Sequence, residues 1–399
     1  MEKNTDQYTK YSHDWKKLIR VPGYVTKFHI KPGTEEISDK AFSDCINLTS
    51  VIIPDSVVYI GNGAFKNCIN LTTVTIPDSV THIGEWAFGG CRRLKNVILP
   101  NSVTHIGAGA FRTCDALENF NIPKSVTHIG DWAISCKSLK NIYIPNSVTH
   151  IGEHAFCETE NLLSIQVGKG NKVYDSRDNC NAIIHTATNT LIQGCINTII
   201  PDSVVNIGEK AFYGCKGMFN VFIPDSVTCI SDGAFSGIDF ISRICVGKGN
   251  KVYDSRDDCN AIIHTATNTL ILGCRSTVNW RLLGSHNTSV PDTVTRIGEG
   301  AFSGCQLMVQ LALPESVTYI KSSAFEGCSN LTSVRVFGSL SKIEEYAFAG
   351  CSSLSSFKVQ GQIQDIEELA FAGCDERLVN DNIPEWALFC DPEDIYEGE

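Results

Sequence analysis

One short phrase returns fourteen times along the 399-residue chain at a nearly constant spacing. In its most regular form it reads V-x-I-P-D-S-V-T-x-I-G-x-x-A-F-x-x-C-x-x-L. The apolar residue before its Pro or Gly is Ile30, Ile53, Ile76, Leu99, Ile122, Ile144, Val167, Ile200, Ile223, Val246, Val290, Leu313, Val336 and Val359. Successive copies lie 23 residues apart, except for one gap each of 22, 33 and 44 residues. Such a period predicts a solenoid, in which each copy forms one coil stacked on the previous one.

Residues 71–93 illustrate what one coil does. Val74 and Ile76 alternate with threonines, which is the pattern of a short strand, and the following proline ends that strand. Gly84 is expected to provide a bend with positive φ. The spacing of Ala, Phe and Cys within residues 85–91 predicts a single helical turn.

One coil cannot bury its own apolar face, so the core must form between coils. We therefore predict an α/β leucine-rich repeat solenoid of about 14 coils with a 23-residue period, mostly β with short helical turns. Nine cysteines follow the Ala of an A-F pair by four residues: Cys45, Cys68, Cys91, Cys114, Cys215, Cys305, Cys328, Cys351 and Cys374. Because they occupy one position on successive coils, they are expected to form a ladder of buried free thiols. Free thiols in this number favour a reducing compartment.

The long gaps contain a second module. Residues 168–195 return as residues 247–274 with changes only at Asn179/Asp258 and Gln193/Leu272. Two β-rich runs surround T-A-T-N in each copy, which predicts two β-hairpin coils, and residues 275–289 are interpreted as a loop insertion.

The repeat divides the chain into three parts. Residues 25–375 are predicted to form the solenoid, preceded by an N-terminal cap at residues 1–24. Residues 376–399 are predicted to be a C-terminal cap with an acidic tail, where Asn382 to Pro384 form a last degenerate strand and Trp386 and Phe389 cover the end.

Charge and hydropathy exclude several classes of function. The net charge of −11 argues against nucleic acid as a partner, because nucleic-acid binding requires a basic surface. No apolar run is long enough to cross a membrane, and the N-terminal residues lack the pattern of a signal peptide. We therefore expect no membrane insertion and a cytoplasmic protein as encoded.

Repeated polar residues suggest chemistry but have simpler explanations. Four consecutive coils carry His82, His105, His128 and His150 at one position, which predicts stacked imidazoles about 5 Å apart. Metal binding or pH sensing at this histidine ladder is the less favoured alternative to a solvated surface row. The aspartates after the prolines are interpreted as turn residues. No nucleophile, phosphate-loop or zinc motif is present, so we expect neither an enzyme nor a cofactor.

The coil phrase LTTVTIPDSVTHIGEWAFGGC and the hairpin phrase VYDSRDNCNAIIHTATNTLIQGC closely resemble the BspA-like leucine-rich repeat family, over about residues 25–375. This resemblance implies a right-handed solenoid used for protein recognition. Members are common in gut and oral anaerobic bacteria and in some protozoa, and several are surface adhesins for extracellular-matrix or host proteins. The family has no catalytic motif to transfer. The chain departs from the adhesin pattern because it shows no signal peptide and no anchor.

The middle residue of each V-x-I run is expected to point away from the core. The proposed ligand-binding residues on this strand face are Ile52, Thr75, Ile98, Asn121, Tyr143, Gln166, Phe222, Arg243, Arg335 and Lys358. Aromatic and aliphatic anchors among polar side chains suit a protein-binding surface. We predict that the protein is a monomer that binds a protein ligand in the manner of an adhesin and is displayed at the cell surface. The alternative is an intracellular interaction scaffold in the cytoplasm.

Overall fold

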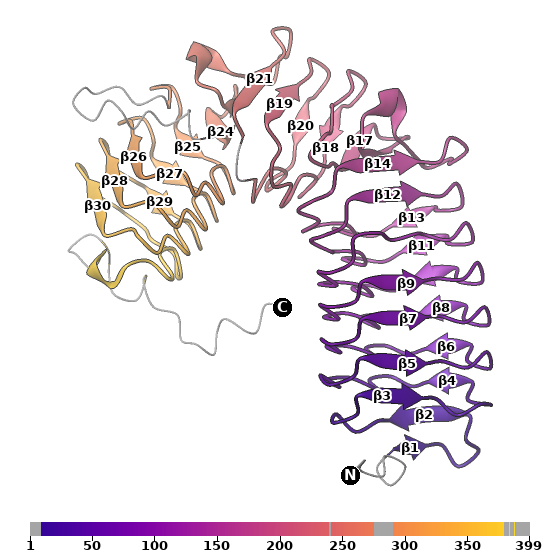
Figure 1. The fold of residues 1–399 in the computed structure, drawn as a ribbon. Coiled ribbons are helices and arrows are strands. Elements are labelled where there is room, and N and C mark those ends of the chain that lie inside the picture. The colour runs from indigo at the N-terminus through magenta and orange to yellow at the C-terminus, as the bar shows by residue number, and fades with distance from the viewer. Residues whose placement is uncertain (1–8, 239–240, 275–289, 379–382, 384–386, 388–399) are drawn as a thin grey trace. The chain divides into compact units, whose positions relative to one another are not determined.

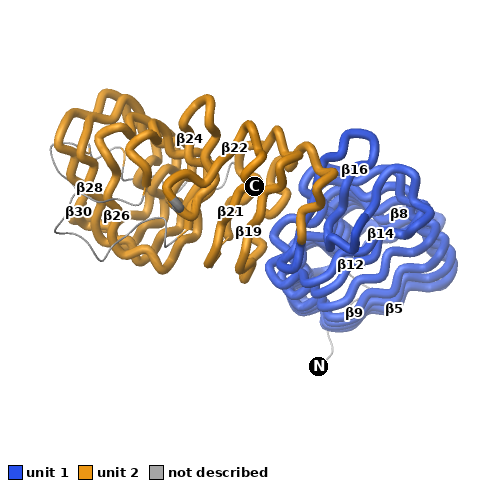
Figure 2. The backbone as a smooth tube through the Cα atoms, turned by 90° about the horizontal axis from the view of Figure 1, so that it is seen from above, with its two compact units in different colours: residues 1–198 blue, residues 199–399 orange. Residues whose placement is uncertain are grey.

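The computed structural model describes residues 9–238, 241–274 and 290–378, together with Ile383 and Ala387. The chain forms two compact units, residues 1–198 and 199–399 (Figure 2). Each unit is a stack of coils in which strands from successive coils lie side by side (Figure 1). The predicted solenoid of about fourteen coils is confirmed.

The coils of unit 1 contribute strands to two parallel ladders, and the first ladder is interrupted where Asn119 makes only an isolated bridge to Asn141. The first ladder contains β3 (Lys27–His29), β5 (Ser50–Ile52), β7 (Thr73–Thr75) and β9 (Asn96–Ile98), and a separate pair is formed by β12 (Asn141–Ile144) and β14 (Ser164–Val167). The second ladder contains β4 (Glu36–Ile37), β6 (Tyr59–Ile60), β8 (His82–Ile83), β10 (His105–Ile106), β11 (His128–Ile129) and β13 (His150–Ile151). At its N-terminal end β4 pairs with β2 (Lys17–Arg20), which pairs antiparallel with β1 (Lys10–Tyr11).

Unit 2 repeats this arrangement. Its first ladder consists of the pair β19 (Asn220–Ile223) and β21 (Arg243–Val246), and of β26 (Gln310–Leu313), β28 (Ser333–Val336) and β30 (Ser356–Val359). Its second ladder consists of the pair β18 (Asn206–Ile207) and β20 (Cys229–Ile230), and of β25 (Arg296–Ile297), β27 (Tyr319–Ile320) and β29 (Lys342–Ile343).

The two predicted hairpin coils are present. In unit 1, β16 (Ile183–His185) pairs antiparallel with β17 (Thr190–Gln193) and with β15 (Tyr174–Asp175). In unit 2, β23 (Ile262–His264) pairs in the same way with β24 (Thr269–Leu272) and β22 (Tyr253–Asp254). A 3₁₀ turn precedes each hairpin, η2 (Arg177–Asn179) and η3 (Arg256–Asp258).

The core is built from identical side chains stacked coil on coil. In unit 1 the rings of Phe42, Phe65, Phe88 and Phe111 stack with centroids 4.7, 5.0 and 5.3 Å apart. The thiols of the predicted ladder lie beside them, and Sγ of Cys68 donates to the carbonyl of Phe42 in the preceding coil at 3.2 Å. The cysteines of the described residues are free, and the ladder is buried except for the half-buried Cys374. The prediction of a buried thiol ladder is thus confirmed.

The predicted helical turns are not helices. Within 85–91 the amides of Trp86, Phe88 and Gly90 donate to carbonyls of the next coil at 2.7 to 2.8 Å. The alternate amides close tight turns within the coil, and Trp86 and Gly90 have positive φ. The Ala-Phe-Cys spacing suits a helix, but the bonds that would propagate it run between coils instead. Helical residues in the described chain are confined to short 3₁₀ segments, including η6 (Glu376–Leu378), and a 3₁₀ position at Ala387.

The prediction for Gly84 is also wrong, because its φ is not positive. A Cβ placed on Gly84 would lie 2.6 Å from the carbonyl carbon of Gly61 in the preceding coil. Glycine is required there because two backbones approach closely, and the positive φ falls two residues later, at Trp86.

The predicted loop insertion at residues 275–289 lies outside the described residues. So do residues 1–8 of the expected N-terminal cap and most of residues 379–399, including Asn382, Pro384, Trp386 and Phe389. At the C-terminal end, Leu378, Ile383 and Ala387 are buried, and the amide of Phe371 donates to the carbonyl of Ala387.

Candidate protein-binding surface

The strand face of unit 1 is the outward side of β3, β5, β7, β9, β12 and β14. Along each strand the side chains alternate between core and solvent, so that Val74 is buried while Thr73 and Thr75 are exposed. Large apolar side chains nevertheless occupy outward positions, since Ile52, Ile98 and Tyr143 are 56%, 65% and 46% exposed. Parallel pairing places Thr75 opposite Ile98 and Tyr143 opposite Gln166.

The strand face of unit 2 continues the same positions on its own strands. Phe222 on β19 is 53% exposed and lies opposite Cys245 on β21, next to Arg243. Arg335 and Lys358 lie opposite each other on β28 and β30, and the Arg335 guanidinium lies 4.8 Å from the ring centroid of Phe337. All ten side chains proposed from the sequence are thus exposed, six on unit 1 and four on unit 2.

Several exposed apolar residues of unit 2 were missed from the sequence, and Ile199 and Phe219 are the most exposed of them. Ile199 is 75% exposed and lies 23 residues before Phe222, so it occupies the same outward position one coil earlier. Phe219, directly before β19, is 65% exposed. The signal for Ile199 was present in T-I-I-P, because the repeat already places Ile200 in register directly after it.

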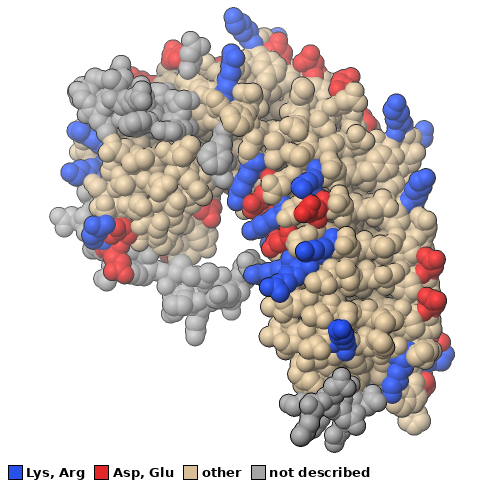
Figure 3. All heavy atoms as spheres, in the orientation of Figure 1, with Lys and Arg blue, Asp and Glu red and all other residues tan. Residues whose placement is uncertain are grey.

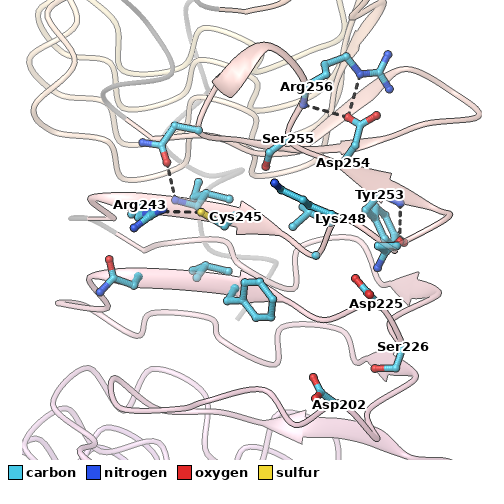
Figure 4. Close-up of a pocket in the computed structure, with 18 of the residues that line it drawn as sticks. Asp202, Asp225, Ser226, Arg243, Cys245, Lys248, Tyr253, Asp254, Ser255 and Arg256 are labelled. Atoms are coloured by element: carbon cyan, nitrogen blue, oxygen red, sulfur yellow. Dashed lines mark hydrogen bonds and ion pairs between the residues drawn. The ribbon is translucent and has the colours of Figure 1, made fainter.

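A groove runs along the strand face of unit 2 below the hairpin module (Figure 4). Phe222 on β19 is one of its lining residues. Arg243 and Cys245 line it on β21, while Lys248 and Arg256 come from the module (Figure 4). Aromatic, cationic and carboxylate groups therefore converge on one concave surface, which makes it a candidate binding site.

Hydrogen bonds hold the module in place above this groove. Nε of Arg256 lies 2.9 Å from Oδ1 of Asp254, and Nη1 donates to Asn268 at 3.1 Å. The buried Tyr253 accepts the Ile230 amide at its hydroxyl at 2.8 Å, and burial raises the pKa of this phenol. The amide of Gly249 donates to Oδ1 of Asp225 in the coil below at 3.0 Å. The module, called the ledge below (residues 247–274, and residues 168–195 in unit 1), is thus a rigid part of the stack.

The histidine ladder forms as predicted. The rings of His82, His105, His128 and His150 follow one another with centroids 5.0, 4.6 and 5.6 Å apart. The Nδ1 atoms of the first three lie 2.8 to 2.9 Å from the hydroxyls of the preceding threonines. Burial, followed by the charges of His128 and His82, lowers the pKa of His105. No group of three or more potential metal ligands occurs among the described residues.

A second row, on the turn edge of unit 1, was not foreseen. The Arg112 guanidinium lies 5.5 Å from the Trp86 ring and 4.7 Å from the Trp132 ring, and Lys66 lies 5.0 Å from Trp86. The Trp86 indole fills the space over Gly109, where an added Cβ would lie 2.8 Å from the ring. These contacts cover the indole with cations, so the row is explained as packing between coils.

Charges of both signs are interspersed on the visible surface. In the view of Figure 3 the Lys and Arg side chains lie among Asp and Glu side chains, and other residues cover most of the face. Among the described residues, no helix is long and apolar enough to span a membrane.

The repeats match the family described as "BspA type Leucine rich repeat region (6 copies)" over residues 24–134, 58–182, 192–257 and 284–387. The chain belongs to this family. No curated protein matches the chain. Nothing in the family or in the described residues points to an enzymatic activity.

Solved structures of bacterial leucine-rich repeat proteins are similar to this BspA-type chain. A leucine rich cell surface protein from Faecalibacterium prausnitzii is 25% identical with a TM-score of 0.56, covering 89% of this chain and 93% of that chain. A leucine-rich repeat protein from Bacteroides ovatus is 26% identical with a TM-score of 0.47, covering 92% of this chain and 90% of that chain.

Proposed function

We propose that the chain is a non-catalytic recognition protein whose strand face binds a protein ligand in the manner of an adhesin, as a monomer. The observation that carries this proposal is the exposure of Ile98, Tyr143, Ile199 and Phe222 at positions where the coil phrase requires no apolar residue. Large apolar side chains that are surrounded by polar neighbours and exposed on rigid strands are typical anchors of protein interfaces.

A panning experiment tests this proposal. The immobilised full chain is panned with a display library of random 16-residue peptides, and enriched clones are retested on the double variant Tyr143→Ala with Phe222→Ala. We expect affinity to fall by at least about tenfold, because interface anchors dominate binding energy. Both side chains are exposed, so thermal stability is expected to stay within about 0.5 kcal/mol of the parent.

The matched control replaces exposed apolar residues away from the strand face. Ile46 and Ile69 lie after the cysteines of their coils and are exposed to a similar degree. The double variant Ile46→Ser with Ile69→Ser should retain all enriched clones. If the clones bind the Tyr143/Phe222 variant with the same affinity as the parent, the binding site does not include these two anchors.

Two cellular settings remain open for this recognition. Resemblance to a cell surface protein supports display outside the cell, where adhesion would be the role. The free cysteines support an intracellular scaffold instead, because unpaired thiols persist in reducing compartments. Protease treatment of intact source cells, followed by blotting, separates them: digestion while the cells stay whole supports adhesion, and survival with the cytosolic fraction supports the scaffold.

A further inference from the structure

The two hairpin modules agree with each other far more than their surroundings do. Residues 168–195 and 247–274 are identical at 26 of 28 positions. The coils directly before them, residues 144–167 and 223–246, are identical at only 10 of 24 positions, and those ten belong to the coil phrase. If one duplication copied coil and module together, both pairs were identical at first. The two modules have therefore diverged less than the two coils before them.

Part of this agreement is required by the fold. The side chain of Asn171 donates to the carbonyls of Pro145 and Val148 and accepts the amides of residues 173 and 174, and Asn250 makes the matching four bonds. Arg177 pairs with Asp175 as Arg256 pairs with Asp254. These contacts account for the agreement at Asn171, Asp175 and Arg177 and at their counterparts in the second module.

They do not explain the exposed lysines. Lys169 and Lys248 are exposed, and neither makes an ion pair among the described residues. Exposed lysines on the other coils vary from coil to coil, whereas the modules retain two, Lys169/Lys248 and Lys172/Lys251. Lys248 lines the groove of unit 2 (Figure 4), which gives the retained cation a place in a candidate site.

An aromatic residue lies below the ledge in both units. Tyr143 and Phe222 are 79 residues apart, which is also the spacing of the two modules. In unit 1 a Cβ on Gly168, next to Lys169, would lie 2.9 Å from the Tyr143 hydroxyl, so the aromatic side chain reaches the ledge. Unit 1 therefore places an aromatic side chain against the backbone directly before a lysine, and in unit 2 the corresponding aromatic residue and lysine line one groove.

Two polar differences between the two sites have opposite effects on charge. Asn146 corresponds to Asp225, which adds a negative charge in unit 2, and each accepts a glycine amide of the ledge. Ser164 corresponds to Arg243, which adds a positive charge. These two changes offset each other, although the coils as a whole differ by one charge, because residues 144–167 hold three glutamates and residues 223–246 hold three aspartates and one arginine.

We propose that each module and the aromatic residue below it form one groove, and that both grooves bind the same ligand, an extended peptide segment with an apolar side chain beside a carboxylate. This inference rests on the proposed function and specifies its ligand. The apolar side chain packs on Tyr143 or Phe222, and the carboxylate pairs with Lys169 or Lys248. A sugar is less suited, because the amides of Asn171 and Asn250 are already used by the backbone.

A peptide array with defined partners tests the proposal. Synthetic 12-residue peptides carry one Leu and one Asp at every spacing in a Gly-Ser background, with Lys-for-Asp peptides as a charge control and chondroitin sulfate as a polysaccharide probe. Binding to the full chain is then measured by isothermal titration. We expect two sites per chain for the best acidic peptide and no binding of its Lys counterpart.

Charge reversal at one lysine at a time assigns the sites. Lys169→Glu and Lys248→Glu should each weaken one of the two sites by about five- to tenfold and leave the other unchanged. Lys251→Glu is the matched control, because Lys251 is an exposed lysine of the same module that does not line the groove. It should leave both sites intact.

Each other outcome overturns the proposal. A single site, or two sites that ignore both lysine variants, refutes the paired grooves, and binding of chondroitin sulfate without any acidic peptide refutes the ligand class. If the lysine variants have no effect while the Tyr143/Phe222 variant still loses its display-selected clones, protein recognition by the strand face stands and only this inference falls.

Discussion

The coils of unit 1 are held so closely at one point that a single methyl group is expected to disturb them. A Cβ on Gly107 would lie 2.6 Å from the carbonyl carbon of Gly84 and 2.7 Å from the amide nitrogen of Glu85. These are backbone atoms, so no side chain can turn away to relieve the contact. The Gly107→Ala substitution should therefore destabilise unit 1 by about 1–3 kcal/mol, the usual range for overpacking.

The size of the effect is limited by what other coils tolerate. Lys321, Glu344 and Glu367 stand at the same position of the phrase in unit 2, so a coil can shift enough to accept a Cβ. In unit 1 such a shift would stretch the bonds on both sides, from the amide of Gly107 to Ile83 and from the amide of Gly130 to Ile106, both 2.9 Å long. The loss should thus be local and measurable rather than complete unfolding.

A second glycine distinguishes close approach of two backbones from the requirement for positive φ. Gly63 has a φ of +59°, and the nearest atom to its added Cβ is a lysine Cγ at 3.5 Å. At Gly63 asparagine should be tolerated better than alanine, because asparagine adopts the left-handed region more readily. At Gly107 asparagine should be as damaging as alanine.

Urea unfolding followed by circular dichroism measures the stability differences, and hydrogen exchange of the amides of residues 107 and 130 reports the local shift. Gly107→Ala with parental stability and unchanged exchange would refute the close-approach argument. Gly107→Asn clearly milder than Gly107→Ala would show that the backbone conformation, rather than the neighbouring coil, selects this glycine.

Three further outcomes follow from the packing of the coils. Phe88→Ala removes a ring stacked on both sides and should destabilise unit 1 by about 3–5 kcal/mol in the same urea assay, whereas a cost below about 1 kcal/mol would contradict the ladder. Cys229 is exposed, whereas burial raises the pKa of Cys45 to about 12, so Cys229→Ser should remove one equivalent of fast thiol labelling from the native chain. The folded state lowers the pKa of His105, so the unfolded state binds more protons near this pKa. Stability should therefore fall as pH drops below about 6.5, the ordinary pKa of histidine. The His105→Gln variant should lose less melting temperature between pH 7.5 and 5.5 than the parent.

The sequence predicted the core well because a solenoid repeats its core. Each of Val74, Ile76, Phe88 and Cys91 is buried against its counterparts 23 residues away, so the period alone identified them. The helical turn was wrong for a related reason. Periodicity records which side chains face inward, and Phe88 faces inward equally in a helix or in a turn whose amides bond to the next coil.

The surface was less predictable. The outward positions on the strands followed from simple alternation, and Tyr143 and Phe222 were recognised in this way. Ile199 could have been predicted, because Ile200 was already in register and alternation makes the preceding residue face outward. The groove below Lys248 could not, because it depends on how far the hairpin rises above the strands, and no spacing in the sequence gives that height. Gly84 shows the same limit, because both a close approach between backbones and a left-handed bend require glycine, and the sequence does not distinguish them.

Agreement between repeats carries different information in different places. Where coils agree at buried positions, as at the stacked phenylalanines, the cause is packing against an identical neighbour, and nothing about a ligand follows. Exposed positions have no such cause. Some of them, such as the histidine ladder, still agree along ordinary coils, whereas exposed lysines on those coils differ from coil to coil. Lys169 and Lys248 are exposed and agree all the same, beside aromatic residues that lie at the same spacing. In a chain whose core explains most of its sequence, that agreement at the surface is where recognition should be sought first.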